Sequence, residues 1–329
     1  MTTGANSRAR SQIHAADPQI NEMLELVEAR LTERLQSREP LLTEISTHLI
    51  GSGGKRVRPA VTLLIYRACG GHDVDDIVDV ATALELIHSA TLLHDDIIDG
   101  SEVRRGTDSA LRKYGLANTL VTGDFVFSRA FQLCARFDEE LIQWAAEACV
   151  ALTEGETMQA RFRRNPAVTV EDYLEIIKRK TASLFQQGAR TAARLAGAPR
   201  PLVEAMASCG LNVGMTFQIV DDLLDVVGAE ARLGKPIGID LRDGNPSLPI
   251  VLAIRQDREV ARTFQDAAPT AAEINAGLRR IRRSGVLAEV RNLAAQYGTR
   301  ALQDLAALPA SPDRDHLALL IGQLLKRAE

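Results

Sequence analysis

The stretch LLHDDIIDGSEVRRG, Leu92 to Gly106, places three aspartates within five residues at the end of an apolar run. If the preceding helix continues through them, Asp95 and Asp99 lie one turn apart on one face. Like charges at this spacing destabilise a helix, and the helix dipole disfavours carboxylates near a C-terminus. For one such cluster a solvated helix end is the more common explanation, although a bound divalent cation would also fit.

A second cluster with the same DDxxD spacing occurs in FQIVDDLLD, Phe217 to Asp225, again late in an apolar helical segment. Gln218 lies three residues before Asp221, on the same face. Both clusters offer only oxygen ligands, which favour Mg²⁺ or Mn²⁺ over Zn²⁺. Because Mg²⁺ commonly completes its shell with substrate phosphate oxygens, we expect two such sites to clamp a diphosphate.

Basic residues lie beside glycines or aspartates, as a diphosphate site requires. Arginine binds phosphate as a planar fork and lysine as a point charge. Each of these basic residues alone is most typical of a solvated surface charge, and their shared placement favours the diphosphate site. The spacing in GSGGKRVRP, Gly51 to Pro59, and the absence of a preceding strand exclude a Walker P-loop. The basic candidates are Lys55, Arg56, Arg58, Arg104, Arg105, Lys180 and Lys235.

The chain has 329 residues, of which 46% are hydrophobic and 25% charged, a composition typical of a globular protein. Nearly every long segment has helical periodicity, for example Asp172 to Leu195, and alternating strand patterns are absent. We expect a helix over Thr169 to Ala196, another over Pro201 to Val227, and a connector from Gly228 to Pro249. The sequence therefore predicts a flexible tail, residues 1–17, and one all-α domain of ten or more helices, residues 18–329.

Several classes of protein do not fit. A net charge of −4 gives no support to nucleic-acid binding. The longest apolar run, Val78 to Leu93, is interrupted by Asp79, Glu85 and His88, so we expect no membrane-spanning helix. The four cysteines form no CxxC pair, which indicates buried free thiols in a reducing compartment and hence a cytoplasmic location.

An ordered series of motifs resembles the trans-isoprenyl diphosphate synthases, also called polyprenyl synthetases, from about Leu42 through Pro249. The motifs are GGKRVRP, LIHSATLLHDDIIDGSEVRRG, TGDFVFSRAF, EGETMQ, KTASLF, FQIVDDLLD and GKPIGIDLRDG. The resemblance implies a helical bundle around a central hydrophobic cavity, and a homodimer. It also implies head-to-tail condensation of isopentenyl diphosphate with an allylic diphosphate. The release of a long apolar product implies peripheral membrane contact.

The resemblance also implies roles for individual residues. The catalytic set is Asp95, Asp96, Asp99, Asp221, Asp222, Asp225 and Lys180, within which Asp95, Asp99, Asp221 and Asp225 hold the metal. The allylic diphosphate is bound by Arg104, Lys180, Thr181, Gln218 and Lys235. Isopentenyl diphosphate is bound by Lys55, Arg58, His88 and Arg105. A lone histidine such as His88 is more often a packed core residue, but its partners in GGKRVRP and RRG favour binding.

Product length is implied by small residues before the first motif. Short-chain members of the family close their product tunnel with a bulky aromatic residue four or five positions before the first aspartate. Here those positions are Thr91 and Ala90. Phe127 and Phe131 share a face and are candidates for a deeper floor, although ordinary core packing explains them equally well. The resemblance thus implies a long-chain, octaprenyl-like synthase serving quinone side chains. A shorter-chain geranylgeranyl or farnesyl diphosphate synthase is the alternative.

The chain departs from the family at GNPSLP, Gly244 to Pro249, where Asn245 stands in the place of a common lysine. This loss of a positive charge would weaken one phosphate contact. Two other functions remain open. A terpene cyclase of similar fold would not need Lys55, Arg58 and Arg105, and a non-catalytic modulating subunit would have eroded aspartate motifs.

Overall fold

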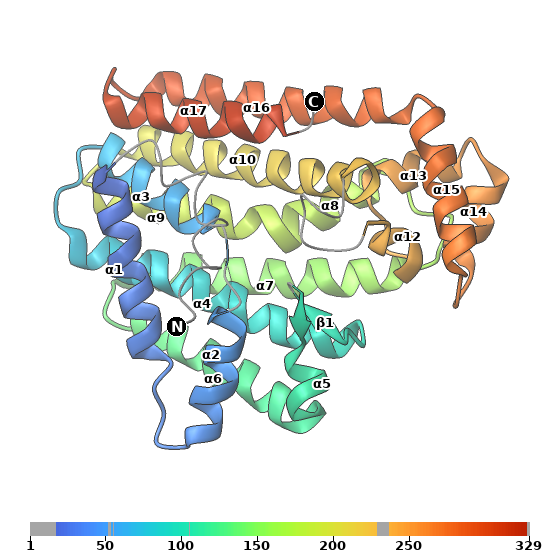
Figure 1. Cartoon of the computed structure of the whole chain (residues 1–329). Coiled ribbons are helices and arrows are strands. Elements are labelled where there is room, and N and C mark those ends of the chain that lie inside the picture. The colour runs from blue at the N-terminus through green and yellow to red at the C-terminus, as the bar shows by residue number, and fades with distance from the viewer. Residues whose placement is uncertain (1–17, 52–53, 55, 105, 229–236, 328–329) are drawn as a thin grey trace. The chain divides into compact units, whose positions relative to one another are not determined.

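The computed structural model describes residues 18–51, 54, 56–104, 106–228 and 237–327. More than ten helices occupy these residues, which confirms the predicted all-α class (Figure 1). The chain divides into two compact units. The first contains the described residues up to Ala146, together with Gln187–Met206 and Leu308–Leu317. The second contains Glu147–Gln186, Ala207–Ala307 and the described residues from Ala318 on. The predicted tail, residues 1–17, lies outside the described residues, and one domain over 18–329 stays a prediction.

The first unit begins with helices that surround the first aspartate motif. They are α1 (Pro18–Arg34), α2 (Pro40–Gly51), α3 (Val57–Ala68), α4 (Val74–Ile98), α5 (Ala110–Tyr114) and α6 (Leu116–Cys134). Between α4 and α5, β1 (Val103–Arg104) and β2 (Thr107–Asp108) form an antiparallel pair. The sequence analysis found no strand, because two residues are too few to produce an alternating pattern.

Helix α4 is the core of the first unit. It packs against α6, α3 and α1, and every residue from Ile77 to Ile87 is buried. A helix that is apolar on all sides is buried inside a protein or a membrane. By length and composition α4 could cross a membrane, but 78% of its most apolar window is buried inside the protein. Helix α4 is therefore buried as a core helix of the protein.

Two acidic side chains on α4 are buried with arginine partners. Asp79 is 1% exposed and accepts hydrogen bonds from Arg30 and from Arg136, the latter at 2.5 Å. Glu85 accepts from the Arg56 guanidinium at 2.6 Å, and both side chains are almost fully buried. These are the acidic residues that interrupt the apolar run in the sequence, and pairing is what permits their burial.

The second unit carries the second aspartate motif. Its core includes buried residues of α8, α10 and α13, such as Tyr173, Ile219 and Val251. Its elements are α8 (Val170–Ile177), a π-helix η1 (Lys178–Ala182), α12 (Ile239–Asp243), α13 (Leu248–Ile254), α14 (Arg258–Gln265), α15 (Ala271–Arg283), α16 (Val286–Asp304) and a 3₁₀ turn η2 (Leu305–Ala307). Four helices have residues in both units: α7 (Glu139–Phe162), α9 (Ser183–Leu195), α10 (Arg200–Val227) and α17 (Pro312–Lys326).

The predicted boundaries agree with these elements, with one correction. The helix expected over Thr169 to Ala196 is α8, η1 and α9 in direct succession, and that expected over Pro201 to Val227 is α10. The prediction of a connector from Gly228 to Pro249 is wrong over the second half of this segment. It contains α12, and α13 already begins at Leu248. Glycines before and after α12, at φ 75° and 69°, made this short helix look like loop sequence.

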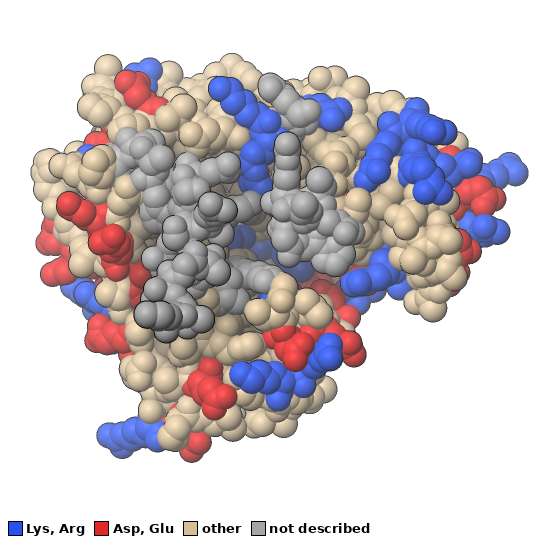
Figure 2. Space-filling view, viewed as in Figure 1, with Lys and Arg blue, Asp and Glu red and all other residues tan. Residues whose placement is uncertain are grey.

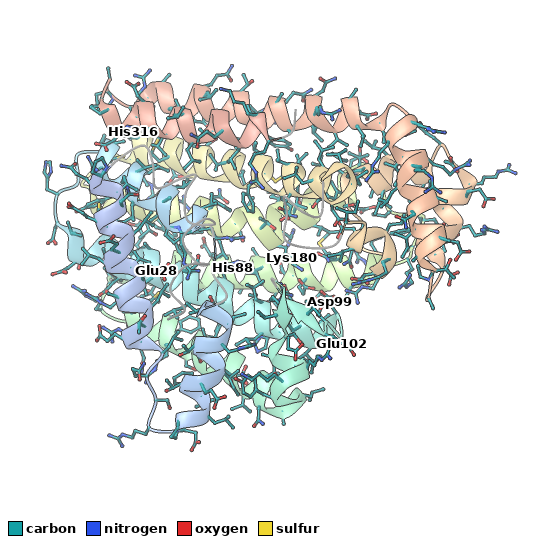
Figure 3. All side chains as sticks on the ribbon, in the orientation of Figure 1. Glu28, His88, Asp99, Glu102, Lys180 and His316 are labelled. Carbon is teal, nitrogen blue, oxygen red and sulfur yellow. The ribbon has the colours of Figure 1, made fainter. Side chains whose placement is uncertain are left out.

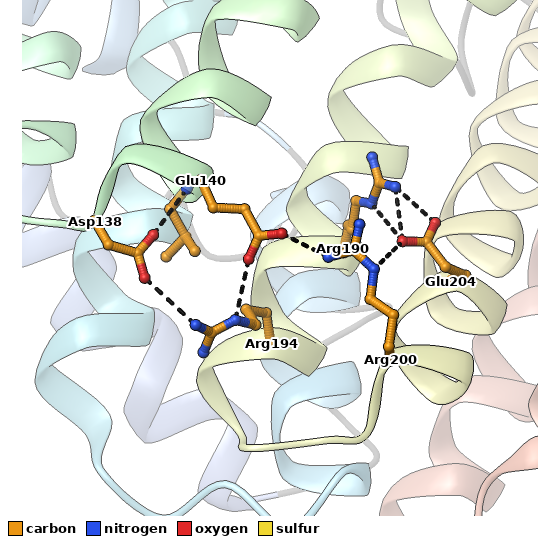
Figure 4. Close-up of polar contacts among 7 residues, drawn as sticks. Asp138, Glu140, Arg190, Arg194, Arg200 and Glu204 are labelled. Atoms are coloured by element: carbon orange, nitrogen blue, oxygen red, sulfur yellow. Dashed lines mark hydrogen bonds and ion pairs between the residues drawn. The ribbon is translucent and has the colours of Figure 1, made fainter.

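An exposed ion-pair network joins helix ends within the first unit (Figure 4). Arg194 donates to Asp138 and Glu140, Arg200 pairs with Glu140 and Glu204, and Arg190 donates to Glu204 at 2.7 Å. The Arg190 guanidinium also lies 4.7 Å from the ring centre of buried Trp144. Each exposed ion pair contributes little to the free energy of unfolding. Together these pairs link α7, α9 and α10, and we assign the network a role in orienting these helices.

The Arg56–Glu85 pair generates a stability prediction. Glu85→Ala leaves the Arg56 guanidinium buried without its buried partner, so we expect the free energy of unfolding to fall by about 3 kcal/mol or more. Glu28, whose side chain is 41% exposed, also pairs with Arg56. Glu28→Ala is the matched control and should lower the free energy of unfolding by about 1 kcal/mol or less. Urea unfolding measures both, and equal losses would contradict this assignment.

Candidate functional site

The first aspartate motif lies at the C-terminal end of α4, as predicted. Asp95 and Asp96 lie in its last turn and Asp99 caps it, with the Asp99 amide donating to the Asp95 carbonyl at 2.8 Å. Asp95 and Asp99 are partly exposed, whereas Asp96 is 0% exposed. The three carboxylates therefore divide into one buried group and two that solvent or a ligand can reach.

Asp96 is held by an arginine that the sequence analysis assigned to substrate. The chain turns back through β1 and β2, and Arg104 Nε donates to Asp96 Oδ1 at 2.6 Å. Burial raises the pKa of the Asp96 carboxyl, and the charge of Arg104 opposes that shift. Since a guanidinium has five donors, this bond does not exclude a second role for Arg104.

Helix α6 comes very close to α4 beside this motif. A side chain at Gly123 would place its Cβ 2.2 Å from His94 Nε2, so the imidazole of His94 would have to move to admit any other residue there. Asp124 then lies 3.4 Å from the same nitrogen. The TGD of the motif TGDFVFSRAF thus fixes the packing of the helix end that carries Asp95.

The second motif lies in the last turns of α10, also as predicted. Asp222 is 7% exposed and accepts hydrogen bonds from the Tyr173 hydroxyl and from Gln218 Nε2, both at 2.7 Å. Gln218 in turn accepts from the Thr181 hydroxyl at 2.9 Å. The predicted residues Gln218 and Thr181 are therefore brought together with the motif. Tyr173, which completes this chain of hydrogen bonds, was missed.

Burial perturbs the titration of Asp222. Desolvation raises the pKa of its carboxyl to about 7, with further raising by Asp221 and Asp225, while the bonds from Gln218 and Tyr173 act in the opposite direction. Burial also raises the pKa of the Tyr173 hydroxyl well above its ordinary value. Strongly perturbed carboxyls beside polar partners are characteristic of functional sites.

Asp225 is bound by the backbone of α12. Its carboxylate oxygens accept from the Ile239 amide at 3.3 Å and the Asp240 amide at 3.2 Å. The Gly238 amide donates to the Asp225 carbonyl at 2.9 Å. This bonding orients the carboxylate, which is 4% exposed, and sequence periodicity gave no sign of it.

Lys180 and Thr181 lie within the π-helix η1, a distortion frequent at functional sites. Helix α7 packs tightly there, because a Cβ at Gly155 would be 2.5 Å from the Lys180 amide nitrogen. Lys180 forms an ion pair with Glu156, from the motif EGETMQ. The sequence analysis assigned no role to Gly155 or Glu156, although it identified their motif.

The residues predicted to bind isopentenyl diphosphate are described only in part. Lys55 and Arg105, like Lys235 of the allylic set, lie outside the described residues. Arg58 and His88 are half-buried, and Figure 3 places His88 on α4. Between Lys55 and Arg58, Arg56 adopts φ 48° and ψ 36°, a left-handed conformation uncommon for arginine. Its bonds to Glu28 and Glu85 hold Arg56 in this conformation.

The predicted chain-length residues lie on α4 and α6. Ala90 is 0% exposed and Thr91 is half-buried, with its hydroxyl donating to the His88 carbonyl. Phe127 and Phe131 contact each other edge to face, with ring centres 5.1 Å apart. Phe131 is 40% exposed within the described chain. Their role in setting product length stays a prediction.

The donor set fits a hard divalent cation, because each motif presents only carboxylate and carbonyl oxygens. Among the described residues, no three or more His, Cys, Asp or Glu side chains converge on one metal position. A cation held by one or two carboxylates and completed by water and substrate oxygens does not need such convergence.

Exposed arginines gather elsewhere in the second unit. Figure 2 shows Lys and Arg over α14 and α15, at the right of the view, where Arg258, Arg262, Arg279 and Arg283 are exposed. Glu259 pairs with Arg262, which leaves a moderately basic surface. Peripheral membrane contact stays a prediction.

Comparison with known proteins identifies relatives along nearly the whole chain. Residues 39–280 match the family model of polyprenyl synthetases. A heptaprenyl diphosphate synthase component 2 from Geobacillus stearothermophilus is 37% identical, covering 92% of this chain and 96% of its own. Octaprenyl diphosphate synthase of Escherichia coli is 33% identical over 88% of this chain and 91% of its own. A crystal structure of a Caulobacter crescentus polyprenyl synthase, complexed with calcium and isoprenyl diphosphate, matches with a TM-score of 0.91. It is 35% identical, over 97% of this chain and 99% of that one.

The raised pKa of Asp222 generates a pH prediction for the metal-free protein. Between about pH 4 and 7 the folded state keeps a proton on Asp222 that the unfolded state releases, so this contribution to stability is lost as pH rises. We expect the Tm in EDTA to fall from pH 5.5 to 8, and to fall less steeply in Asp222→Asn. Parallel pH profiles of wild type and variant would contradict the burial argument.

Proposed function

We propose that this chain, which belongs to the polyprenyl synthetase family, makes a long-chain all-trans polyprenyl diphosphate. It is a prenyltransferase that extends an allylic diphosphate with isopentenyl diphosphate. The observation that carries the proposal is the pair of DDxxD motifs, in each of which the second aspartate is buried and held by its own chain. The long-chain product is supported by the relatives named as heptaprenyl and octaprenyl diphosphate synthases.

In the proposed mechanism, the accessible carboxylates of Asp95, Asp99 and Asp221, together with Asp225, hold divalent cations against the allylic diphosphate. Mg²⁺, or Mn²⁺, would supply Lewis-acid charge to the diphosphate oxygens when bound. The Caulobacter synthase, complexed with calcium and isoprenyl diphosphate, supports a divalent cation of this kind. Asp96 and Asp222 are positioning groups, because their bonds to Arg104, Tyr173 and Gln218 fix the turns that carry their neighbours.

The reaction explains why cations accompany the aspartates. The allylic C1–O bond breaks, its electron pair leaves with the diphosphate, and the resulting carbocation adds to the double bond of isopentenyl diphosphate. Loss of one proton then restores a double bond. We propose that the positive charges of Arg104, Lys180 and Lys235 stabilise the leaving diphosphate. Thr181 and Gln218 would add hydrogen bonds. Isopentenyl diphosphate would be held by Lys55, Arg58, His88 and Arg105.

Product length is proposed to depend on the small side chains one turn before the first motif. Ala90 is buried and has no side chain beyond Cβ, so an aromatic ring at this position would occupy volume that the alanine does not. A shorter geranylgeranyl or farnesyl product is the second candidate. A terpene cyclase is disfavoured by the match to synthases along the chain.

Ala90→Phe should shorten the product by several isoprene units, because its ring occupies the proposed tunnel. The purified chain is incubated with Mg²⁺, isopentenyl diphosphate and geranyl, farnesyl or geranylgeranyl diphosphate, and dephosphorylated products are separated by chromatography. Thr91→Ala, which adds no volume, is the control and should keep the wild-type length. Release of a cyclic hydrocarbon, or unchanged product length in Ala90→Phe, would contradict the proposal.

We propose a homodimer in the cytoplasm. Helix α6 exposes Leu116, Leu120 and Val121 at 59%, 44% and 54%, an apolar surface suited to a second copy. The four cysteines are free, and burial raises the pKa of Cys69 to about 12 and of Cys134 to about 11, as for unreactive thiols in a reducing compartment.

The Geobacillus relative is named as component 2 of its synthase, which suggests another arrangement, in which a second protein is required. Sedimentation and an elongation assay of the purified chain, without any other protein, distinguish a homodimer from a two-component enzyme. We expect dimer mass with full elongation activity. A monomer without activity would instead support a two-component enzyme.

A further inference from the structure

Asn245 is attached to the second aspartate motif through the backbone. Its amide donates to the Asp240 carbonyl at 2.8 Å, and the Asp240 amide donates to Asp225 Oδ2 at 3.2 Å. The backbone amide of residue 245 is thus two hydrogen bonds from a motif carboxylate, at the position where the family resemblance places a lysine.

An arginine from a distant part of the sequence contacts this asparagine. Arg163 lies just beyond the end of α7, and its Nε donates to Asn245 Oδ1 at 3.2 Å. Arg163 and Asn245 are both half-buried. A positive charge therefore lies beside position 245 although residue 245 itself is neutral.

The next residue fixes the backbone of this segment. Arg164 adopts φ 58°, and its amide donates to the Gly244 carbonyl at 2.8 Å. Its guanidinium donates to the carbonyls of Asp266 and Arg242. These bonds attach the end of α7 to the loop after α12, so the position of Arg163 beside Asn245 is preorganised rather than incidental.

We propose that Arg163 is a further binding residue for the allylic diphosphate and supplies the positive charge that residue 245 lacks. The inference rests on the proposed function. A guanidinium has five donors in a planar fork, so it can bond Asn245 and also address phosphate oxygens. The pairing also explains the asparagine. Its amide oxygen accepts from Arg163, whereas a lysine there would oppose a like charge.

The test is a double-mutant cycle with Arg163→Gln, Asn245→Lys and the combined variant. We expect R163Q to lower kcat/KM for the allylic substrate about tenfold or more, the usual effect of losing a charged hydrogen bond. In the N245K background, R163Q should lower kcat/KM for the allylic substrate by less than about threefold, because the lysine restores the positive charge. The KM for isopentenyl diphosphate should stay unchanged in all variants. Arg161→Gln is the matched control, since Arg161 is exposed and stacks on Phe162.

Binding of inorganic diphosphate with Mg²⁺, measured by calorimetry, gives a readout that a structural role would not move. R163Q should weaken it about tenfold at unchanged Tm. Asn245→Asp provides a second route, because its carboxylate neutralises Arg163 without removing it, and should weaken the binding similarly. Equal losses from R163Q in both backgrounds, or unchanged diphosphate affinity in R163Q and N245D, would overturn the inference. Failure of the wild-type chain to elongate the allylic substrate in the kinetic assay would instead overturn the proposed function.

Discussion

The burial of the second aspartate in each motif, Asp96 and Asp222, is the constraint on which the rest of the site depends. A carboxylate buried at the end of an apolar helix costs free energy unless its own chain supplies donors. Asp96 receives Arg104 through the β1–β2 turn, and Asp222 receives Tyr173 and Gln218. These bonds fix the helix turns from which Asp95, Asp99 and Asp221 project, so the accessible carboxylates are ordered before any ligand binds.

The same principle extends outward to the cations. Gln218 links Asp222 to Thr181 and so to the π-helix that carries Lys180, while Glu156 pairs with that lysine. Arg56 is buried between Glu28 and Glu85 in a left-handed conformation. Arg104 and Lys180, two described cations proposed to meet the allylic diphosphate, are therefore each oriented by a partner of opposite charge, which reduces the reorganisation needed when substrate arrives.

The helical class, the long helices and both motif positions could be predicted, because helical periodicity and the DDxxD spacing are local properties of the sequence. Partners from distant segments could not. No local pattern distinguishes Tyr173, Glu156 or Arg163 from other residues of their types, because their partners Asp222, Lys180 and Asn245 lie far away in the sequence. The helix α12 was taken for loop because its flanking glycines resemble turn signals, although its amides bind Asp225.

The central proposal is that the two motifs and the cations assigned to them bind a metal-bound diphosphate. The most direct test is the Tm at pH 8 with Mg²⁺ alone, inorganic diphosphate alone, and both together. The account predicts a joint increase larger than the sum of the separate ones, since each ligand completes the binding site of the other. A Tm that the combination leaves unchanged would contradict it.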